Sequence, residues 1–403
     1  METEMISFLD GKVILHAGDC VEVLATLPEC SVDSVVCDPP YHLTSIVKRF
    51  GAENASPAKV GKTGAFARAS AGFMGKRWDG GDVAFQVETW AQVLRVLKPG
   101  GHLIAFSGTR TYHRMVSAID DAGFEIRDQI GWAYGSGFPK SHNAGDGWGT
   151  ALKPAWEPVV LARKPLAGTV AETVCQYGTG AINIDGCRVE ASGRPAREVA
   201  ALREDVIYGG NALMGRVDGS LQSSKAVGST DLGRWPANLI HDGSEEVLAA
   251  FPADCPSGGH ISHRSAPKSY GGLGCPAEER VGFPDSGSAA RFFYTAKADA
   301  EDRLGSKHPT VKPLDLMQWL VRLVTPKGGV VLDPFAGTGT TGEAAWREGM
   351  KAILIEREPE YQADTVRRME LAVNPTKRSA VAKTKNNLDR PEDLPLFAME
   401  SAE

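Results

Sequence analysis

Asp333-Pro334-Phe335-Ala336-Gly337-Thr338-Gly339-Thr340-Thr341 is the stretch of sequence that decides the fold. It follows a short apolar segment at 329–332 and precedes a segment with helical spacing that begins near Thr341. Its glycines permit a tight turn and a close approach of the backbone to a ligand. Free N–H groups at the start of the helix would attract an anionic group. A nucleotide-binding P-loop needs a lysine after its second glycine, and none follows Gly339, which disfavours an NTPase.

A single acid, Glu356, ends the next predicted strand at 352–355. An acid at this place after a glycine-rich loop suits hydrogen bonding to ribose hydroxyls. The alternative is a plain strand-to-helix turn with a surface glutamate, and the combination of loop and acid speaks against it. The sequence therefore predicts a site for a ligand that contains a nucleoside.

Strands and helices alternate on both sides of this loop. The apolar pattern predicts seven strands, at 12–18, 32–37, 102–106, 125–134, 156–163, 329–332 and 352–355. Helical spacing is found at 20–27, 83–97, 110–122, 313–324, 341–348 and 359–373. This alternation predicts an α/β fold with a mixed, mostly parallel sheet that helices cover on both faces. The strands at 125–134 and 156–163 read as a hairpin.

Composition sets the class of protein more broadly. The chain has 403 residues, of which 42% are hydrophobic, and a net charge of −6. These values are ordinary for a soluble globular protein, and no apolar run is long enough for a membrane helix. The seven cysteines contain no CxxC pair, which predicts reduced thiols in a cytoplasmic protein. Taken whole, the acidic charge argues against a nucleic-acid partner.

The local charge reverses that argument between residues 42 and 78. Seven basic residues stand there against one acid, a net +6, in a segment rich in Gly, Ala and Ser. The two interpretations are a solvated loop and a flap that contacts phosphates. Lys48, Arg49, Lys76 and Arg77 are the candidates for DNA contact within it. Lys140 and Ser141, which follow another strand, are further candidates.

Directly before the basic segment, Asp38-Pro39-Pro40-Tyr41 follows the predicted strand at 32–37. Two prolines fix the backbone and remove two N–H donors, so carbonyl groups and the Asp38 carboxylate remain as acceptors. Such a rigid array suits an exocyclic amine, and Tyr41 can stack on a flat ring. The alternative is a rigid loop start without chemistry.

These segments together resemble the amino-methylating DNA methyltransferases that use S-adenosylmethionine (AdoMet). The family's catalytic [DNS]PP[YFW] motif is present as DPPY, and its cofactor loop as DPFAGTGTT. The catalytic motif precedes the cofactor loop, as in the permuted β class, and His308-Pro309-Thr310-Val311-Lys312-Pro313 resembles that class's HPTxKP element. Residues 178–185 and 234–240 resemble phage and prophage members. The resemblance covers residues 1–165 and 291–373 and implies a Rossmann-like, seven-stranded methyltransferase sheet with an irregular insertion.

The resemblance also implies the roles of individual residues. The expected catalytic residues are Asp38, Pro39, Pro40 and Tyr41. Asp19 would accept from the adenine of AdoMet, and His308, Thr310 and Lys312 would lie at its methionine end. The complete set expected to bind AdoMet is Asp19, Cys20, His308, Thr310, Lys312, Asp333, Phe335, Ala336, Gly337, Gly339, Thr340, Thr341 and Glu356.

The implied activity is methylation of N6 of adenine in duplex DNA by base flipping and direct in-line transfer, with no metal. DPPY in the β-class order favours adenine, because cytosine-N4 enzymes more often carry Ser at the first position. Methylation of cytosine N4 is the alternative, and an RNA methyltransferase or a non-catalytic DNA-binding protein is less favoured. The expected setting is a stand-alone modification enzyme in the cytoplasm of a bacterial host.

The resemblance divides the chain into four parts. Residues 1–165 and 291–373 would form the methyltransferase domain, 166–290 the target-recognition insertion, and 374–403 a disordered tail. A homodimer is implied, and residues 394–397 (LPLF) resemble peptides that dock sliding clamps. Cys255, His260, His263 and Cys275 raise the alternative of a zinc site, although their spacing fits no standard finger. Trp132 and Trp156 are expected to pack in the core.

Overall fold

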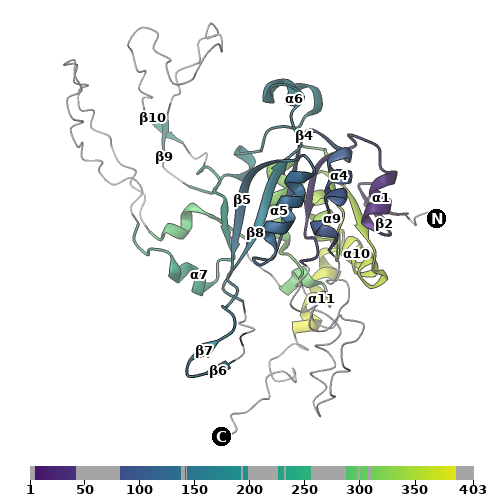
Figure 1. Cartoon of the computed structure of the whole chain (residues 1–403). Coiled ribbons are helices and arrows are strands. Elements are labelled where there is room, and N and C mark those ends of the chain that lie inside the picture. The colour runs from purple at the N-terminus through teal and green to yellow at the C-terminus, as the bar shows by residue number, and fades with distance from the viewer. Residues whose placement is uncertain are drawn as a thin grey trace, which may run out of the picture. The chain divides into compact units, whose positions relative to one another are not determined.

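The structure is a computed structural model, and it describes residues 5–41, 82–137, 141, 143–191, 194–197, 226–230, 233–255, 287–296, 300–306, 308 and 310–386. The chain forms two compact units (Figure 1). The first consists of Met1–Cys187, Ala237–Val247 and Phe293–Glu403, and the second of Arg188–Pro236 and Leu248–Phe292. The basic segment 42–78, Lys140 and the peptide 394–397 lie outside the described residues, as do His260, His263 and Cys275.

One sheet organises the first unit. Among the described residues it has ten strands in the order β1-β2-β14-β13-β3-β4-β8-β5-β11-β12. Their bounds are β1 Met5–Phe8, β2 Val13–Ala17, β3 Val32–Cys37, β4 Leu97–Phe106, β5 Glu125–Ala133, β8 Trp156–Arg163, β11 Leu239–His241, β12 Tyr294–Thr295, β13 Val330–Asp333 and β14 Lys351–Glu356. The pairs from β2 through β14, β13 and β3 to β4 are parallel, whereas β8 is antiparallel to both β4 and β5. The predicted hairpin of β5 and β8 is thereby confirmed.

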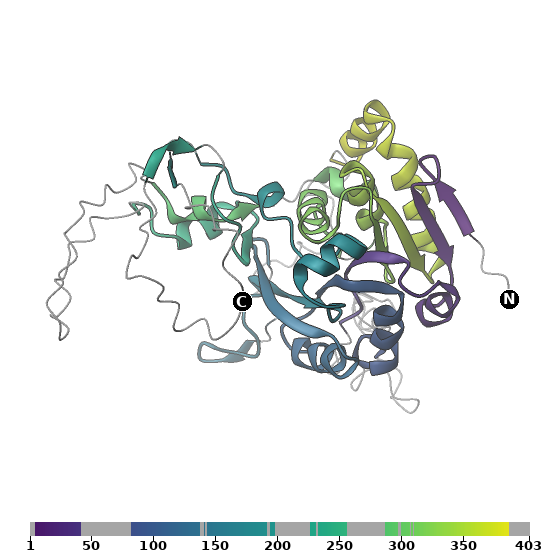
Figure 2. The same cartoon turned by 90° about the horizontal axis from the view of Figure 1, so that it is seen from above.

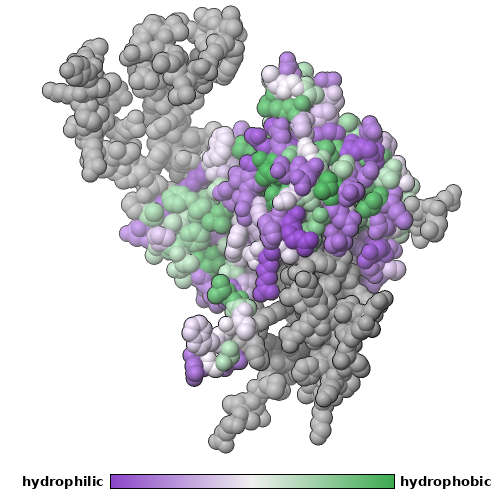
Figure 3. All heavy atoms as spheres, in the orientation of Figure 1, coloured by the Kyte–Doolittle hydropathy of each residue, from purple (hydrophilic) through white to green (hydrophobic). Residues whose placement is uncertain are grey.

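Helices cover both faces of this sheet. The helices of the first unit are α1 Cys20–Thr26, α4 Val87–Val96, α5 Tyr112–Asp121, α6 Val170–Tyr177, α8 Leu314–Val324, α9 Thr340–Arg347, α10 Pro359–Ala372 and α11 Pro375–Asn386, while α7 (Glu245–Ala250) crosses the boundary of the units. Figure 2 shows α8–α10 on the side of the strands opposite to α4 and α5. The outward surface over α4 and α5 is mainly hydrophilic (Figure 3).

The two apolar cores follow from the alternation of side chains along the strands. Val36 and Ile104 belong to a core shared with α8 and α9, whereas the neighbouring Val35 and Leu103 belong to a core shared with α1, α4 and α5. Every residue of β3 is buried, as expected for a strand covered on both faces. The apolar runs therefore predicted these strands correctly.

The functional edge of the sheet is set by the pairing of β3 with β13. The Asp33 carboxylate accepts from the Val330 N–H at 2.7 Å across 297 residues of chain. From this pair the order runs outward through β14 and β2 on one side and through β4 on the other. Ligands bind at such reversals, outside the carboxyl ends of the strands. Asp333 ends β13 here, and Asp38 follows β3.

The structure differs from the sequence expectations at three places. Among the described residues the sheet has ten strands where seven were expected, because the short β1, β11 and β12 extend its edges. The second unit begins at Arg188 rather than at 166, and Ala237–Val247 belongs to the first unit. Helix α6 and strand β11 therefore lie in the same unit as the sheet. Part of the tail expected to be disordered forms α11, whose Arg378 pairs with the buried Glu343. The rest of the tail, from residue 387, lies outside the described residues.

No helix in the described ranges is long and apolar enough to cross a membrane. The six cysteines that the structure describes are free. No cluster of metal-ligating side chains is found among the described residues.

Candidate active site

A cavity of about 670 Å³ lies within the first unit, at the carboxyl ends of β2, β3, β13 and β14. Segments far apart in sequence line it together: the DPPY motif, Asp19 and Cys20, the 308–312 segment, the glycine-rich loop and Glu356. Of the predicted catalytic and cofactor residues, Gly339 is the one that does not reach the lining. The sequence therefore predicted a dispersed set of residues that the fold brings into one place.

Hydrogen bonds among its own residues hold the glycine-rich loop in shape. Asp333 accepts from the Phe335 N–H at 3.0 Å and from the Thr341 hydroxyl at 2.5 Å, which joins the two ends of the loop. Gly337 and Gly339 have φ angles of +52° and +76°, a region that favours glycine. Gly339 thus shapes the loop without lining the cavity. Burial raises the pKa of Asp333 to about 7.

Glu356 connects β14 to this loop. One carboxylate oxygen accepts from the Gly337 N–H at 2.7 Å and the other from the Glu358 N–H at 2.8 Å. Burial raises its pKa to about 7, although those backbone donors act in the opposite direction. Each carboxylate oxygen can accept a second hydrogen bond, so Glu356 can still receive a hydroxyl from the cavity.

The end of β2 supplies the neighbouring wall. Asp19 caps α1 by accepting from the Val21 N–H at 2.9 Å. The preceding residue, Gly18, donates its N–H to the Glu356 carbonyl at 3.0 Å, which ties the two predicted nucleoside contacts together. Burial raises the pKa of the Cys20 thiol to about 12. Cys20 therefore contributes a neutral, apolar contact rather than a nucleophile.

His308 and Thr310 form a turn on the opposite side of the loop. The Thr310 N–H donates to His308 Nδ1 at 3.3 Å, and the imidazole packs edge-on against Tyr361 with ring centroids 4.4 Å apart. The His308 Nε2 atom lies 3.4 Å from where a Cβ on Gly337 would stand. A Cβ at 337 would therefore be in van der Waals contact with this turn.

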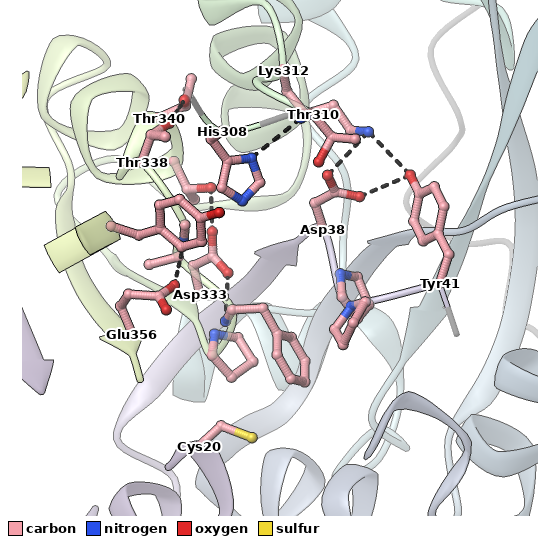
Figure 4. Close-up of a pocket in the computed structure, with 18 of the residues that line it drawn as sticks. Cys20, Asp38, Tyr41, His308, Thr310, Lys312, Asp333, Thr338, Thr340 and Glu356 are labelled. Atoms are coloured by element: carbon pink, nitrogen blue, oxygen red, sulfur yellow. Dashed lines mark hydrogen bonds and ion pairs between the residues drawn. The ribbon is translucent and has the colours of Figure 1, made fainter. Parts of the chain in front are cut away.

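A cluster of four polar side chains, Lys312, Asp38, Tyr41 and Glu157, lines one end of the cavity. Figure 4 shows the first three of them. The Lys312 ammonium lies 3.1 Å from Asp38 Oδ2, 2.7 Å from Glu157 Oε2 and 3.0 Å from the Tyr41 hydroxyl. The Tyr41 hydroxyl in turn lies 2.8 Å from Asp38 Oδ1 and 3.1 Å from Glu157 Oε2. Lys312 is 5% exposed. Two half-buried carboxylates thus share one buried ammonium.

Burial governs the ionisation of this cluster. It raises the pKa of Asp38, and the charge of Glu157 raises it further, while Lys312 opposes the shift. The pKa of Tyr41 is raised by burial and then by the two acids. For Lys312, burial lowers the pKa, but Asp38 and Glu157 outweigh it and the net shift is upward. Lys312 and Tyr41 therefore stay protonated.

Several lining residues were not predicted. Glu157, Tyr134 and Tyr361 line the cavity, and none of them belongs to the DPPY motif, the HPTxKP element or the glycine-rich loop. Trp156 was expected in the core, but it is 43% exposed and lines the cavity, whereas Trp132 is buried as expected. Trp156 and Glu157 stand at the start of β8, on the same edge of the sheet as Asp38. This position is the signal that would have identified them as lining residues.

Ser141 is the one predicted DNA contact that the structure describes. It is exposed and lies outside the cavity lining. Its hydroxyl accepts from the N–H groups of Thr150 and Ala151 at 2.9 and 3.3 Å. Its observed contacts are thus within the loop that joins β5 to β8.

Fold and cavity together define an α/β protein with a nucleoside-type pocket next to a cluster of amine acceptors. The chain belongs to the N6/N4 family of DNA methylases, whose model matches residues 32–367. This match spans the DPPY motif, the glycine-rich loop and Glu356.

Individual relatives are more distant. The chain is 24% identical over 277 residues to the Type II methyltransferase M.HindIII of Haemophilus influenzae, covering 64% of this chain and 60% of the relative. It is 41% identical over 69 residues to the Type II methyltransferase M2.DpnII of Streptococcus pneumoniae, covering 17% and 26%. The matches thus span under two thirds of these relatives' lengths. Among solved structures, the cytosine-N4-specific PvuII DNA methyltransferase is similar with 16% identity, 95% and 97% coverage and a TM-score of 0.46.

Proposed function

We propose that this protein transfers a methyl group from AdoMet to an exocyclic amine of a base in duplex DNA. The observation that carries the proposal is the position of Asp38 and Glu356 in one cavity, at the ends of strands on either side of β13. A nucleoside-type subsite and an amine-acceptor subsite therefore face each other. Membership of the DNA methylase family supports the same conclusion.

The lining fits AdoMet by its chemistry. Asp19 and Glu356 offer acceptors to the adenine and ribose, with Cys20 and Phe335 as apolar contacts. The N-terminus of α9 at Thr340 suits the methionine end through its N–H groups, and the side chains of His308 and Thr310 lie in the same lining. The volume of about 670 Å³ is within the range of cofactor pockets. When bound, AdoMet supplies an electrophilic methyl group on a sulfonium.

The residues of the chain then orient the nucleophile. An exocyclic amine is a weak nucleophile because its lone pair is delocalised into the ring. The Asp38 carboxylate and the Pro39 carbonyl accept its two hydrogens and favour the pyramidal form of the nitrogen. The ring of Tyr41 lies against the flipped base. Fixing the amine in line with the methyl group supplies much of the acceleration.

The amine is N6 of adenine in this proposal. The support is Asp38 itself, because the aspartate form of the motif in this order of motifs is typical of adenine enzymes. The second candidate is N4 of cytosine, which presents similar hydrogen-bonding groups. Digesting the methylated DNA to nucleosides and identifying them by mass spectrometry separates the two, and N4-methylcytosine would contradict the adenine assignment.

The second unit is proposed to read the target sequence, within the predicted insertion at 166–290. Its described part contains the antiparallel pair β9 Arg194–Arg197 and β10 Ala226–Thr230. Trp235 is 64% exposed, and the Arg188 guanidinium lies 5.3 Å from the centre of its ring. Exposed aromatic and guanidinium groups suit contacts with bases and phosphates.

The decisive experiment uses labelled AdoMet with duplex DNA, RNA or protein as acceptor. We expect label in duplex DNA, and exclusive labelling of RNA or protein would contradict the proposal. Asp38→Ala should bind AdoMet nearly as well as the wild type but transfer no methyl group. A variant that retains activity would remove Asp38 from the mechanism.

A further inference from the structure

We propose that Glu157 is a positioning residue for methyl transfer, which holds the Lys312 ammonium away from exclusive pairing with Asp38 and so preserves the acceptor strength of Asp38. This inference rests on the proposed function. Neither the DPPY motif nor the glycine-rich loop contains Glu157, which stands 116 residues from Tyr41 and 155 from Lys312.

The distances show which carboxylate holds Lys312 more closely. The Lys312 Nζ atom lies 2.7 Å from Glu157 Oε2 and 3.1 Å from Asp38 Oδ2. Glu157 Oε2 is also within 3.1 Å of the Tyr41 hydroxyl. Glu157 thus contacts both groups that contact Asp38.

The position of Glu157 is fixed by the sheet rather than by a flexible loop. It lies in β8, paired with Trp132 of β5, next to the strand that carries Phe106. The Lys312 ammonium also lies 4.7 Å from the centre of the Phe106 ring, a favourable place for a cation. Lys312 is therefore held on the β4–β8 side of the cavity, beside Asp38 rather than across it.

The charges around Asp38 explain how the position of Lys312 would affect methyl transfer. The described groups that act on Asp38 are Lys312, Glu157 and Tyr41, and Asp333 lies close enough to be affected by its charge. With Glu157 present, the Lys312 ammonium is shared between two carboxylates. Without that charge, Lys312 would pair with Asp38 alone, and a closed ion pair is a weaker acceptor for the hydrogens of the target amine.

Glu157→Gln tests this inference because it keeps the size of the side chain and removes its charge. We expect kcat to fall by up to about 100-fold, with the Kd for AdoMet within threefold of the wild type. The acid limb of the kcat profile should move to lower pH, because the charge of Glu157 helps to raise the pKa of Asp38. Glu157→Asp restores the charge and should recover part of kcat and the original acid limb.

The matched control is Glu88→Gln, an exposed glutamate on α4, which should change none of these values. If the wild type is active and Glu157→Gln has the same kcat and the same acid limb, the role of Glu157 is overturned. The proposed function would not be affected by that result. A parallel loss of AdoMet binding would also overturn it, because it would show a general defect of the pocket. A wild type that methylates no DNA would instead overturn the proposed function and this inference together.

Discussion

Glu356 illustrates how burial sets the properties of a single side chain. The sequence predicted an acid at this place, and the structure puts it in the cavity lining. What the sequence could not supply is its pKa, because the two backbone donors and the enclosing walls come from the fold. Its pKa is about 7 rather than 4.5, with burial as the main cause.

We predict that the stability of the ligand-free protein depends on pH through Glu356. A raised pKa in the folded state contributes stability below the unfolded value of 4.5, and this contribution is lost as pH rises through about 7. The loss is on the order of 3 kcal/mol. Urea unfolding between pH 4.5 and 8 measures it, and Glu356→Gln should make the profile less steep, while the raised pKa of Asp333 leaves a remaining slope. An equally steep profile in that variant would contradict the prediction.

Gly339 shows a second consequence at the scale of one residue. A Cβ there would stand 2.8 Å from Thr365 Cγ2, on a backbone that already favours glycine. Gly349 has the same φ of +76°, but none of the described atoms lies within 4 Å of its would-be Cβ. We expect Gly339→Ala to destabilise by about 1–3 kcal/mol more than Gly349→Ala. Equal thermal shifts for the two variants would show that the contact with Thr365 is unimportant.

Some residues of the site can be predicted from sequence motifs, whereas Glu157 cannot. Asp38, Lys312 and Glu356 stand in short segments whose composition resembles a known family, so they were predicted. Glu157 is a lone acid at the start of a strand, and its partners are far away in sequence. Its meaning depends on the antiparallel β8 ending on the same edge as β3. Only the fold supplies that information.

Among the elements, α11 depends most on tertiary contacts. Its sequence, PTKRSAVAKTKN, has no marked apolar face. The polar composition of the tail is the reason that disorder was predicted. In the structure Arg378 of α11 lies 2.5 Å from Glu343 of α9, which is fully buried and also pairs with Arg368 and Arg347. Arg368 donates to the Thr338 carbonyl at 2.8 Å, which connects α11 indirectly to the glycine-rich loop.

We predict that Arg378→Met lowers stability by about 1–3 kcal/mol, since a buried ion pair is lost while Glu343 keeps two partners. Arg347→Met is the matched control because Arg347 pairs with the same carboxylate but is 36% exposed; it should cost under about 1 kcal/mol. Chemical denaturation measures both. Similar losses for the two variants would place the stabilising contribution elsewhere.

The strands fall into two groups with respect to prediction. The seven predicted strands carry apolar runs long enough to be recognised, and all seven are present. The edge strands β11 and β12 have three and two residues, too few for any periodicity. β11 forms on the edge of β5, and β12 in turn pairs with β11.

At the scale of the whole molecule, the first unit is built from both halves of the sequence. The pairs β13–β3 and β14–β2 join strands from opposite parts of the chain. We predict that a fragment of residues 1–187 does not unfold cooperatively in urea, because β2 and β3 would lose their common neighbours β14 and β13. Adding residues 237–403 should restore a circular-dichroism transition. A sharp transition in the first fragment alone would contradict this expectation.

The pairing of β3 with β13 also determines when the first unit can fold during protein synthesis. Asp33 leaves the ribosome 297 residues before its partner Val330, an interval of roughly 15–60 s at bacterial and eukaryotic rates of translation. For most of that interval the nascent chain holds the DPPY motif but neither Lys312 nor the glycine-rich loop. A chain released before residue 312 would therefore hold one wall of the cavity without the residues that complete its lining. The lining is assembled only late in translation.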